Sequence, residues 1–304
     1  MGVSRQNTYS FFVYIIIFFA LKRPKFLIWS ILFAFFRNFV PNFVKYFFMS
    51  MQTAERVSSH EHSDNVIFQR HLVAYNEAAR HISGKVLEVG CGEGYGVSIL
   101  APHASDYMAI DKYATDIDRY AQGLDHVRFA QMSVPPLPFA DNTFDFVVSF
   151  QVIEHIENDR ALIAEMSRVL KPGGSLILTT PNIKMSLTRN PWHIREYTVV
   201  GLHNLLRQYF GKVDMMGVYG NAKVEDYYYR NKESVSKFTR FDVFNLQYRL
   251  PRQVLQIPYD LLNRMNRRLL LSKNTQLVDD IKVDDYHIAP ASDTCFDLLP
   301  IAIK

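Results

Sequence analysis

One stretch of this chain decides its fold: Val86-Leu87-Glu88-Val89-Gly90-Cys91-Gly92-Glu93-Gly94-Tyr95-Gly96. A short apolar run leads into glycines at every second position, and a helical pattern follows. Glycine has no Cβ, so the backbone of such a turn can approach a ligand closely. The start of the following helix offers unpaired N–H groups to the same ligand. The stretch therefore predicts a strand, a ligand-binding turn and a helix, although a tight turn without a ligand would use similar residues.

Two acidic residues narrow the choice of ligand. Glu88 lies just before the first glycine, where it could contact an ammonium group. Asp111 ends the next predicted strand, where an acid accepts hydrogen bonds from ribose hydroxyls. The loop reads G-x-G-x-G-x-G rather than the G-x-G-x-x-G of dinucleotide-binding folds. An acid for a cationic amino acid and another for a ribose favour S-adenosylmethionine over NAD.

Strand and helix patterns alternate on both sides of this loop. An α/β fold with a parallel sheet and helices on both faces is expected. The apolar run 144–150 is typical of a central strand that is buried on both faces. The predicted strands are 85–89, 107–110, 127–130, 144–150, 175–180, 213–219 and 296–303, and the predicted helices are 66–82, 95–100, 115–122, 159–170 and 199–210.

The alternation stops at a polar, tyrosine-rich segment. Residues 221–294 are partly helical in pattern, around 253–271, and we interpret them as an insertion before the last strand. We expect the main domain to span 66–304, after a polar linker at 51–65.

Residues 1–50 differ from the rest of the chain in charge and hydrophobicity. They carry six Lys and Arg residues and no acid, so the remainder of a chain of net charge +4 is mildly acidic. That balance argues against a nucleic-acid-binding surface. Apolar runs at 11–21, 26–36 and 39–49 are each shorter than the ~20 residues of a membrane span. A membrane contact through 11–49, a signal peptide and a true start at Met51 are the alternatives.

The two cysteines, Cys91 and Cys295, provide neither a disulfide framework nor a cysteine metal cluster. This favours a reducing, cytoplasmic location. If residues 11–49 contact a membrane, the protein would be associated with its cytoplasmic face. His60 and His62 are too isolated to predict a metal site, and we expect none.

Four further segments resemble the class I S-adenosylmethionine-dependent methyltransferases: 137–148, 151–156, 168–174 and 180–182. The resemblance implies a Rossmann-like, mostly parallel, seven-stranded sheet, with 213–219 and 296–303 as an antiparallel pair at its end. It also implies a cofactor site, in which an acid often follows the third strand. Here that position is Ser133, so backbone contacts would replace the carboxylate. The expected cofactor-binding residues are Glu88, Gly90, Cys91, Gly92, Gly94, Asp111, Lys112, Met132, Ser133 and Gln151.

The candidate catalytic residue is His155. It follows the fourth predicted strand, at the sheet edge where ligands bind in open α/β folds. Imidazole titrates near pH 6.5 and suits a general base, but a histidine that packs the next helix is the competing interpretation. His193 and Arg195 follow the fifth strand and could bind the acceptor, or could belong to a salt bridge within the loop.

The acceptor is suggested by resemblance alone. Residues 55–56, 68–71 and 190–197 look like those of bacterial methyltransferases encoded with cell-surface polysaccharide genes, which implies a sugar hydroxyl, free or on a lipid-linked glycan. Glu154-His155 also occurs in quinone-biosynthesis O-methyltransferases. A non-catalytic S-adenosylmethionine-binding protein and a nucleotide-dependent oxidoreductase are the alternatives from other classes.

Overall fold

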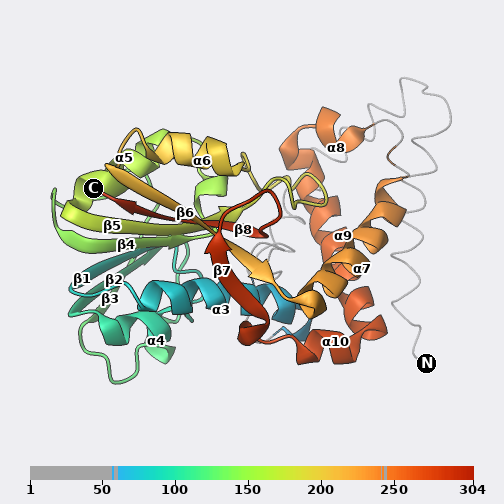
Figure 1. The fold of residues 1–304 in the computed structure, drawn as a ribbon, viewed down its shortest axis with the longest axis horizontal. Helices are drawn as coiled ribbons and strands as arrows, with labels where there is room; N and C mark the ends of the chain where they lie inside the picture. Colours follow the sequence, from blue (N-terminus) through green and yellow to red (C-terminus); the bar gives the residue numbers. More distant parts are fainter. Residues whose placement is uncertain (1–56, 58–60, 241, 243–244) are drawn as a thin grey trace, which may run out of the picture. The chain divides into compact units, whose positions relative to one another are not determined.

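The computed structural model describes residues 57, 61–240, 242 and 245–304, which contain one eight-stranded sheet (Figure 1). The strand order is β3-β2-β1-β4-β5-β8-β6-β7. The strands are β1 (Lys85–Val89), β2 (Asp106–Asp111), β3 (Val127–Gln131), β4 (Phe144–Phe150), β5 (Leu170–Pro181), β6 (Lys212–Gly220), β7 (Tyr286–Pro290) and β8 (Asp297–Ile303).

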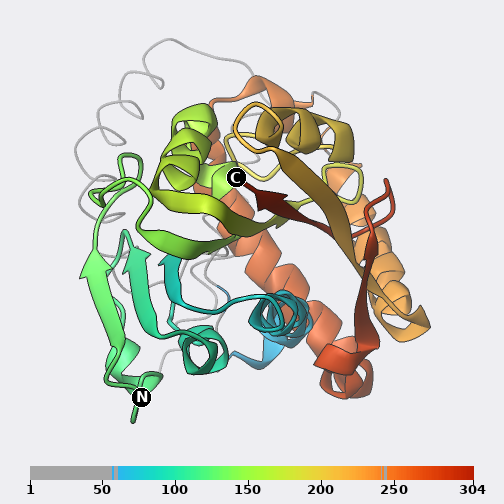
Figure 2. The ribbon, with the colours of Figure 1, turned by 60° about the vertical axis from the view of Figure 1, so that its left-hand side comes forward.

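The expected Rossmann-like α/β fold is confirmed, but the expected count of seven strands is wrong. Strands β1 to β5 are parallel, and β8 runs antiparallel to both β5 and β6. Within the described residues, the additional strand is β7, which pairs with Met216–Gly220 of β6 and forms the edge opposite β3 (Figure 2). It is short and ends in Pro290, which an edge strand tolerates. Its surroundings in the sequence are polar, so no local pattern marked it as a strand.

Helices cover both faces of the sheet (Figure 1). On one face lie α3 (Asn65–Ala79) and α4 (Val97–Leu100), and on the other α5 (Asp159–Val169) and α6 (Val199–Leu206). Alternate residues of a central strand supply the two cores, because successive side chains point to opposite faces. The helix expected at 115–122 is reduced to the 3-10 turn Ile117–Arg119, in which only Ile117 is buried.

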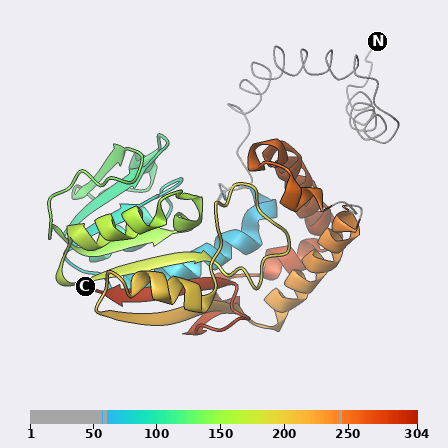
Figure 3. The ribbon, with the colours of Figure 1, turned by 90° about the horizontal axis from the view of Figure 1, so that it is seen from above.

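The insertion forms four helices and then β7. Helices α7 (Ala222–Thr239), α8 (Leu246–Arg249), α9 (Arg252–Lys273) and α10 (Thr275–Asp280) lie beyond the carboxyl ends of the parallel strands (Figure 1). The loop after β5 runs between the sheet and these helices (Figure 3). Two contacts hold it there: the Trp192 indole N–H donates to Asp260 at 2.9 Å, and Arg189 donates to the Gln247 carbonyl at 2.8 Å.

In the part of the chain that the structure describes, no helix is both long enough and apolar enough to span a membrane. The N-terminal apolar runs at 11–49 and most of the 51–65 linker lie outside the described residues.

Candidate active site

The glycine loop has the backbone that its sequence requires. Gly90, Gly92 and Gly94 have φ values of 82°, 59° and 91°, a region that favours glycine. A Cβ on Gly90 would lie 2.3 Å from Val152 Cγ2, so this glycine is also needed for packing. A Cβ on Gly92 would meet nothing within 4 Å. The backbone at Gly92 therefore faces open space, as a ligand cradle must.

Asp111 is held against this cradle at the end of β2. Its Oδ2 accepts a hydrogen bond from the Gly92 N–H at 2.9 Å, and its Oδ1 accepts from the Tyr113 N–H at 2.8 Å. The Met132 N–H donates to the Asp111 carbonyl at 2.8 Å. Lys112 and Ser133 are exposed at the same edge. Residues predicted from three separate segments are thus brought together at the carboxyl ends of β1, β2 and β3.

Glu88 lies beneath the loop rather than at its surface. It is 1% exposed, and its two carboxylate oxygens accept hydrogen bonds from the Tyr75 and Tyr107 hydroxyls, each at 2.8 Å. Burial raises the pKa of Glu88 to about 7, against the lowering effect of both tyrosines. Both oxygens bond tyrosines and the side chain is enclosed, which supports a role in holding the loop. The expected direct contact with an ammonium group stays a prediction. Neither tyrosine was predicted, because both come from other elements, α3 and β2, and no local pattern connects them with the loop.

Gln151 occupies a strained position just after β4. Its φ is 56°, its N–H donates to the Thr179 carbonyl at 2.9 Å, and its side chain donates to Thr179 Oγ1 at 3.2 Å. The buried ion pair between Arg70 and Asp297, at 2.9 Å, lies beside it, since the Gln151 side chain also bonds Asp297. This pair was not predicted, because nothing in the local sequence connects the start of α3 with the start of β8.

Two histidines meet where the loops after β4 and β5 converge. The ring centroids of His155 and His193 are 5.0 Å apart, and the ring planes meet at 75°, in an edge-to-face arrangement. His155 Nδ1 lies 3.2 Å from the Trp192 carbonyl, which suits donation from an Nδ1–H. His193 Nδ1 lies 2.7 Å from Glu196 Oε1, and Asn190 Nδ2 lies 2.8 Å from His193 Nε2. Each ring is therefore held in one orientation.

Glu154 completes this cluster. It is 1% exposed, and one of its oxygens accepts from the Thr180 hydroxyl at 3.0 Å. Burial raises the pKa of Glu154, while the neighbouring His155 and His193 lower it. Its carboxylate and the two imidazoles offer ligand atoms that all lie within 4.8 Å of one another. A cation could be held there, so the expected absence of a metal stays a prediction.

Arg195 does not join the histidines. Its guanidinium pairs with Asp159 at 3.0 Å and donates to the carbonyls of Ile156 and Glu157 at 3.0 and 2.8 Å. These bonds fasten the loop to the start of α5. The geometry therefore gives Arg195 an anchoring role and does not support the predicted contact with the acceptor. Glu196, the neighbour of Arg195 in sequence, pairs with His193.

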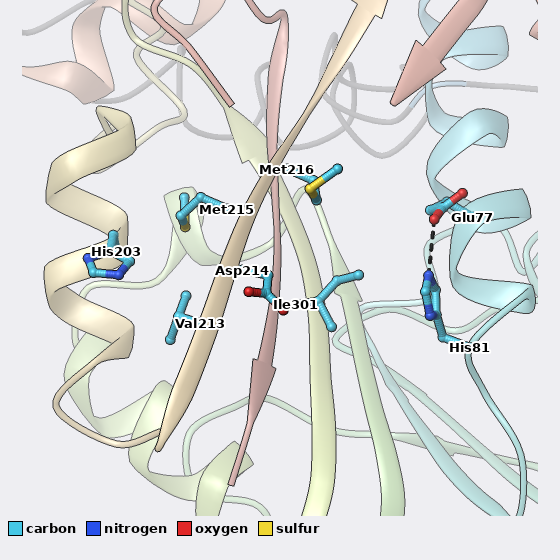
Figure 4. Close-up of a pocket in the computed structure, with 8 residues that line it drawn as sticks. All are labelled: Glu77, His81, His203, Val213, Asp214, Met215, Met216 and Ile301. Atoms are coloured by element: carbon cyan, nitrogen blue, oxygen red, sulfur yellow. Dashed lines mark hydrogen bonds and ion pairs between the residues drawn. The ribbon is translucent and has the colours of Figure 1, made fainter. Parts of the chain in front are cut away.

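An open hollow on the sheet lies apart from these residues (Figure 4). It surrounds the half of β6 that β7 leaves unpaired, between the last turn of α3 and α6 (Figure 4). Among the residues that line it, His81 Nε2 lies 3.0 Å from Glu77 Oε1. None of the predicted site residues lines it, so it contributes nothing to the site. Its lining residues are Glu77, His81, His203, Val213, Asp214, Met215, Met216 and Ile301.

Known proteins resemble this chain over the same region. A family model described as a methyltransferase domain matches residues 87–178. A probable S-adenosylmethionine-dependent methyltransferase of Mycolicibacterium smegmatis is 31% identical over 263 residues, which are 83% of this chain and 94% of that protein. A ubiquinone biosynthesis O-methyltransferase of Rickettsia typhi is 31% identical over 120 residues, which are 38% of this chain and 47% of that protein.

A solved structure also resembles it. The crystal structure of a methyltransferase from Thermotoga maritima superposes with a TM-score of 0.50 and covers 89% of this chain and 98% of that one. The two sequences are 13% identical, so this likeness concerns the fold alone.

Proposed function

The chain belongs to the S-adenosylmethionine-dependent methyltransferases, and we propose that it methylates a hydroxyl of a sugar or glycan intermediate. The observation that carries the proposal is the pair of oriented imidazoles, His155 and His193, at the carboxyl edge of the sheet beside the glycine loop. A hydroxyl acceptor needs a proton acceptor at the point of transfer, whereas many other acceptors do not.

The cofactor site fits the residues present. We propose that S-adenosylmethionine lies over Gly90, Cys91, Gly92 and Gly94, with its ribose on Asp111 and its adenine near Lys112, Met132 and Ser133. The open space at Gly92 and the position of Asp111 support this placement. When bound, the cofactor supplies a methyl group activated by its sulfonium charge. Gln151 would border the same site, and Glu88 would support the loop from below.

We propose His155 as the base that takes the acceptor proton. With Nδ1–H directed at the Trp192 carbonyl, its Nε2 is the proton-accepting atom. The hydroxyl oxygen then forms its bond to the methyl carbon as the carbon–sulfur bond breaks, and the proton passes to the imidazole. His193 is the runner-up, because Glu196 holds its Nδ1 as a carboxylate holds the histidine of a catalytic dyad. The Asn190 amide, which lies 2.8 Å from His193 Nε2, would have to move before that atom accepts a proton.

Two substitutions separate these bases. If His193 is the base, Glu196→Gln should lower turnover strongly, because the imidazole loses the charge that stabilises its protonated form. If His155 is the base, the same variant should retain most of its activity, while His155→Gln should not. A His155 that only packs its loop predicts a lower melting temperature in His155→Ala and normal turnover per folded molecule in His155→Gln.

A quinone precursor is the second candidate acceptor. The Rickettsia relative supports it, over less than half of either chain. The purified full-length chain should be incubated with methyl-labelled cofactor and, separately, with sugar nucleotides, a lipid-linked oligosaccharide extract and a catechol quinone precursor. Transfer of label to the glycan fractions alone is expected. Label on the quinone precursor alone would overturn the glycan proposal, and binding without transfer to any class would favour a non-catalytic protein.

We further propose that residues 11–49 contact the cytoplasmic membrane face. Their acid-free, basic and apolar composition supports this. Full-length protein should then pellet with membranes from its own cells. Should N-terminal sequencing of the native protein begin at Met51, that contact would be ruled out.

A further inference from the structure

Helix α9 buries two polar side chains on the side that faces the rest of the protein. Its buried residues are Asp260, Asn266 and Leu270, of which two are polar. Asp260 accepts from the Trp192 indole at 2.9 Å, and Asn266 accepts from the Ser234 hydroxyl at 2.6 Å. A surface helix normally buries its apolar side. In α9 the side that contacts the rest of the protein carries these two polar side chains together with Leu270 and Leu271, which pack in the core.

The outward side of α9 is correspondingly apolar. Side chains at positions i, i+3, i+7, i+8 and i+11 share one side of a helix, and here they are between 42% and 58% exposed. Leu246 and Tyr248 of α8 add exposed fractions of 44% and 63%. A concentration of exposed apolar side chains of this kind marks an interaction surface. We call the α9 residues the α9 apolar face: Val254, Ile257, Leu261, Leu262 and Met265.

The exposed charged residues of α8 and α9 are all basic, although Arg267 of α9 is paired with Asp64. Residues 245–273 contain six basic residues and a single acid, Asp260, which is 4% exposed. Arg249, Arg268 and Lys273 are exposed. Over 245–273, all of which the structure describes, no carboxylate reaches the surface to offset them. Any occupant of the face must therefore match an apolar strip with a positive border.

We propose that the α9 apolar face lies in the interfacial region of a membrane rich in anionic lipids. An amphipathic helix with large apolar residues on one side and arginines around them is suited to that position. This surface is separate from residues 11–49, and the proposal holds whichever acceptor the enzyme uses.

Charge disfavours a second copy of the chain as the occupant of this surface. A second copy packed face to face would oppose the same arginines to one another. An anionic lipid surface reverses the sign of the interaction, with each Lys or Arg near the surface contributing about 1 kcal/mol.

The proposed orientation brings the membrane close to the candidate active site. Asp260, on the inward side of α9, bonds Trp192 in the loop that also carries His193. The helix is thus one hydrogen bond away from the loop after β5. A membrane-bound α9 would hold that loop about one helix diameter, roughly 10 Å, from the lipid surface.

A local probe tests the contact in the full-length chain, where residues 1–50 could bind lipid by themselves. We would attach an environment-sensitive fluorophore to Leu261→Cys and, as a control, to Gln122→Cys, which is exposed in the segment between β2 and β3. The natural Cys91 and Cys295 are both buried. With phosphatidylglycerol vesicles, emission from position 261 should shift to the blue and be quenched by spin-labelled lipid. Emission from position 122 should not change.

Three results would overturn the proposal. The first is vesicle binding without a spectral change at position 261, or no binding at all. The second is a blue shift that grows with protein concentration and needs no vesicles, which would indicate a second copy. The third is a blue-shifted signal that vesicles leave unchanged, which would indicate a cover supplied by the chain itself.

A charge substitution tests the energetics independently. Leu261→Glu should weaken binding to these vesicles about tenfold, because it removes buried apolar area and adds a repelled charge. Gln276→Glu adds the same charge on α10, outside the α9 apolar face, and should change binding by about twofold at most. Equal effects of the two variants, with both melting normally, would contradict a docked α9.

Discussion

The buried carboxyl group of Glu88 should make the stability of this protein depend on pH. In the folded state its pKa is raised from the ordinary 4.5 to about 7, with burial as the largest cause. Between these two pH values the folded state holds a proton that the unfolded state has released. The free energy of unfolding therefore falls as pH rises from about 4.5 to about 7, and this contribution is constant above that range.

The size follows from the shift. At about 1.4 kcal/mol per unit, a rise from 4.5 to about 7 makes ionised Glu88 cost about 3 kcal/mol at pH 8. Glu88→Gln removes the ionisation and keeps one acceptor and one donor for Tyr75 and Tyr107. Relative to the unsubstituted protein, the variant should thus gain about 2.5 kcal/mol of stability between pH 5 and pH 8, because at pH 5 the unfolded carboxyl group is already mostly ionised.

Urea unfolding followed by circular dichroism, at several pH values from 5 to 8, measures this difference. Subtracting the two proteins cancels the contributions of other carboxyl groups, including Asp297 and Glu154, whose pKa values burial also raises. Glu157→Gln, at an exposed position, is the matched control. A stability difference between Glu88→Gln and the unsubstituted protein that stays constant across this range would refute the reasoning.

Other substitutions address the cofactor loop and the base. Asp111→Ala should weaken S-adenosylhomocysteine binding in calorimetry about tenfold or more, because a carboxylate that accepts ribose hydrogen bonds is lost; unchanged heat would place the ribose elsewhere. His155→Gln should lower turnover by about 10²–10⁴-fold with near-normal cofactor affinity, and a similar loss in His193→Gln alone would transfer the role to that residue. Gly90→Ala should lower the melting temperature, because its Cβ would meet Val152 at 2.3 Å and its φ is 82°, and normal melting would contradict this account of the loop.

The glycine loop and the parallel strands were predictable because their signals are local. An apolar run followed by spaced glycines reports its own backbone geometry, whatever the rest of the chain does. Asp111 was predictable for a related reason: in a parallel sheet, the ends of adjacent strands meet at one edge. The structure brings Asp111 within 2.9 Å of the Gly92 N–H.

Features that depend on distant partners were not predictable in this way. Glu88 reads as a ligand contact from its position in the loop, and only the tyrosines of α3 and β2 show that it is enclosed. Arg195 and Glu196 are neighbours in sequence, but their partners are Asp159 and His193. The side on which each side chain emerges decides these pairs, and the irregular loop after β5 has no periodicity from which that side could be read.

Helix α9 shows a second way in which local patterns mislead. Its sequence is amphipathic, and the ordinary rule would turn Val254, Leu261 and Met265 toward the core. Tertiary contacts turn them outward instead, because Asp260 and Asn266 find buried partners in the Trp192 loop and in α7. These hydrogen bonds offset the cost of burying the two polar groups, and Leu270 and Leu271 pack into the core beside them, so the observed orientation is stable. The apolar side is then free to serve as an external surface, and a pattern that first reads as core packing becomes the basis for a lipid contact.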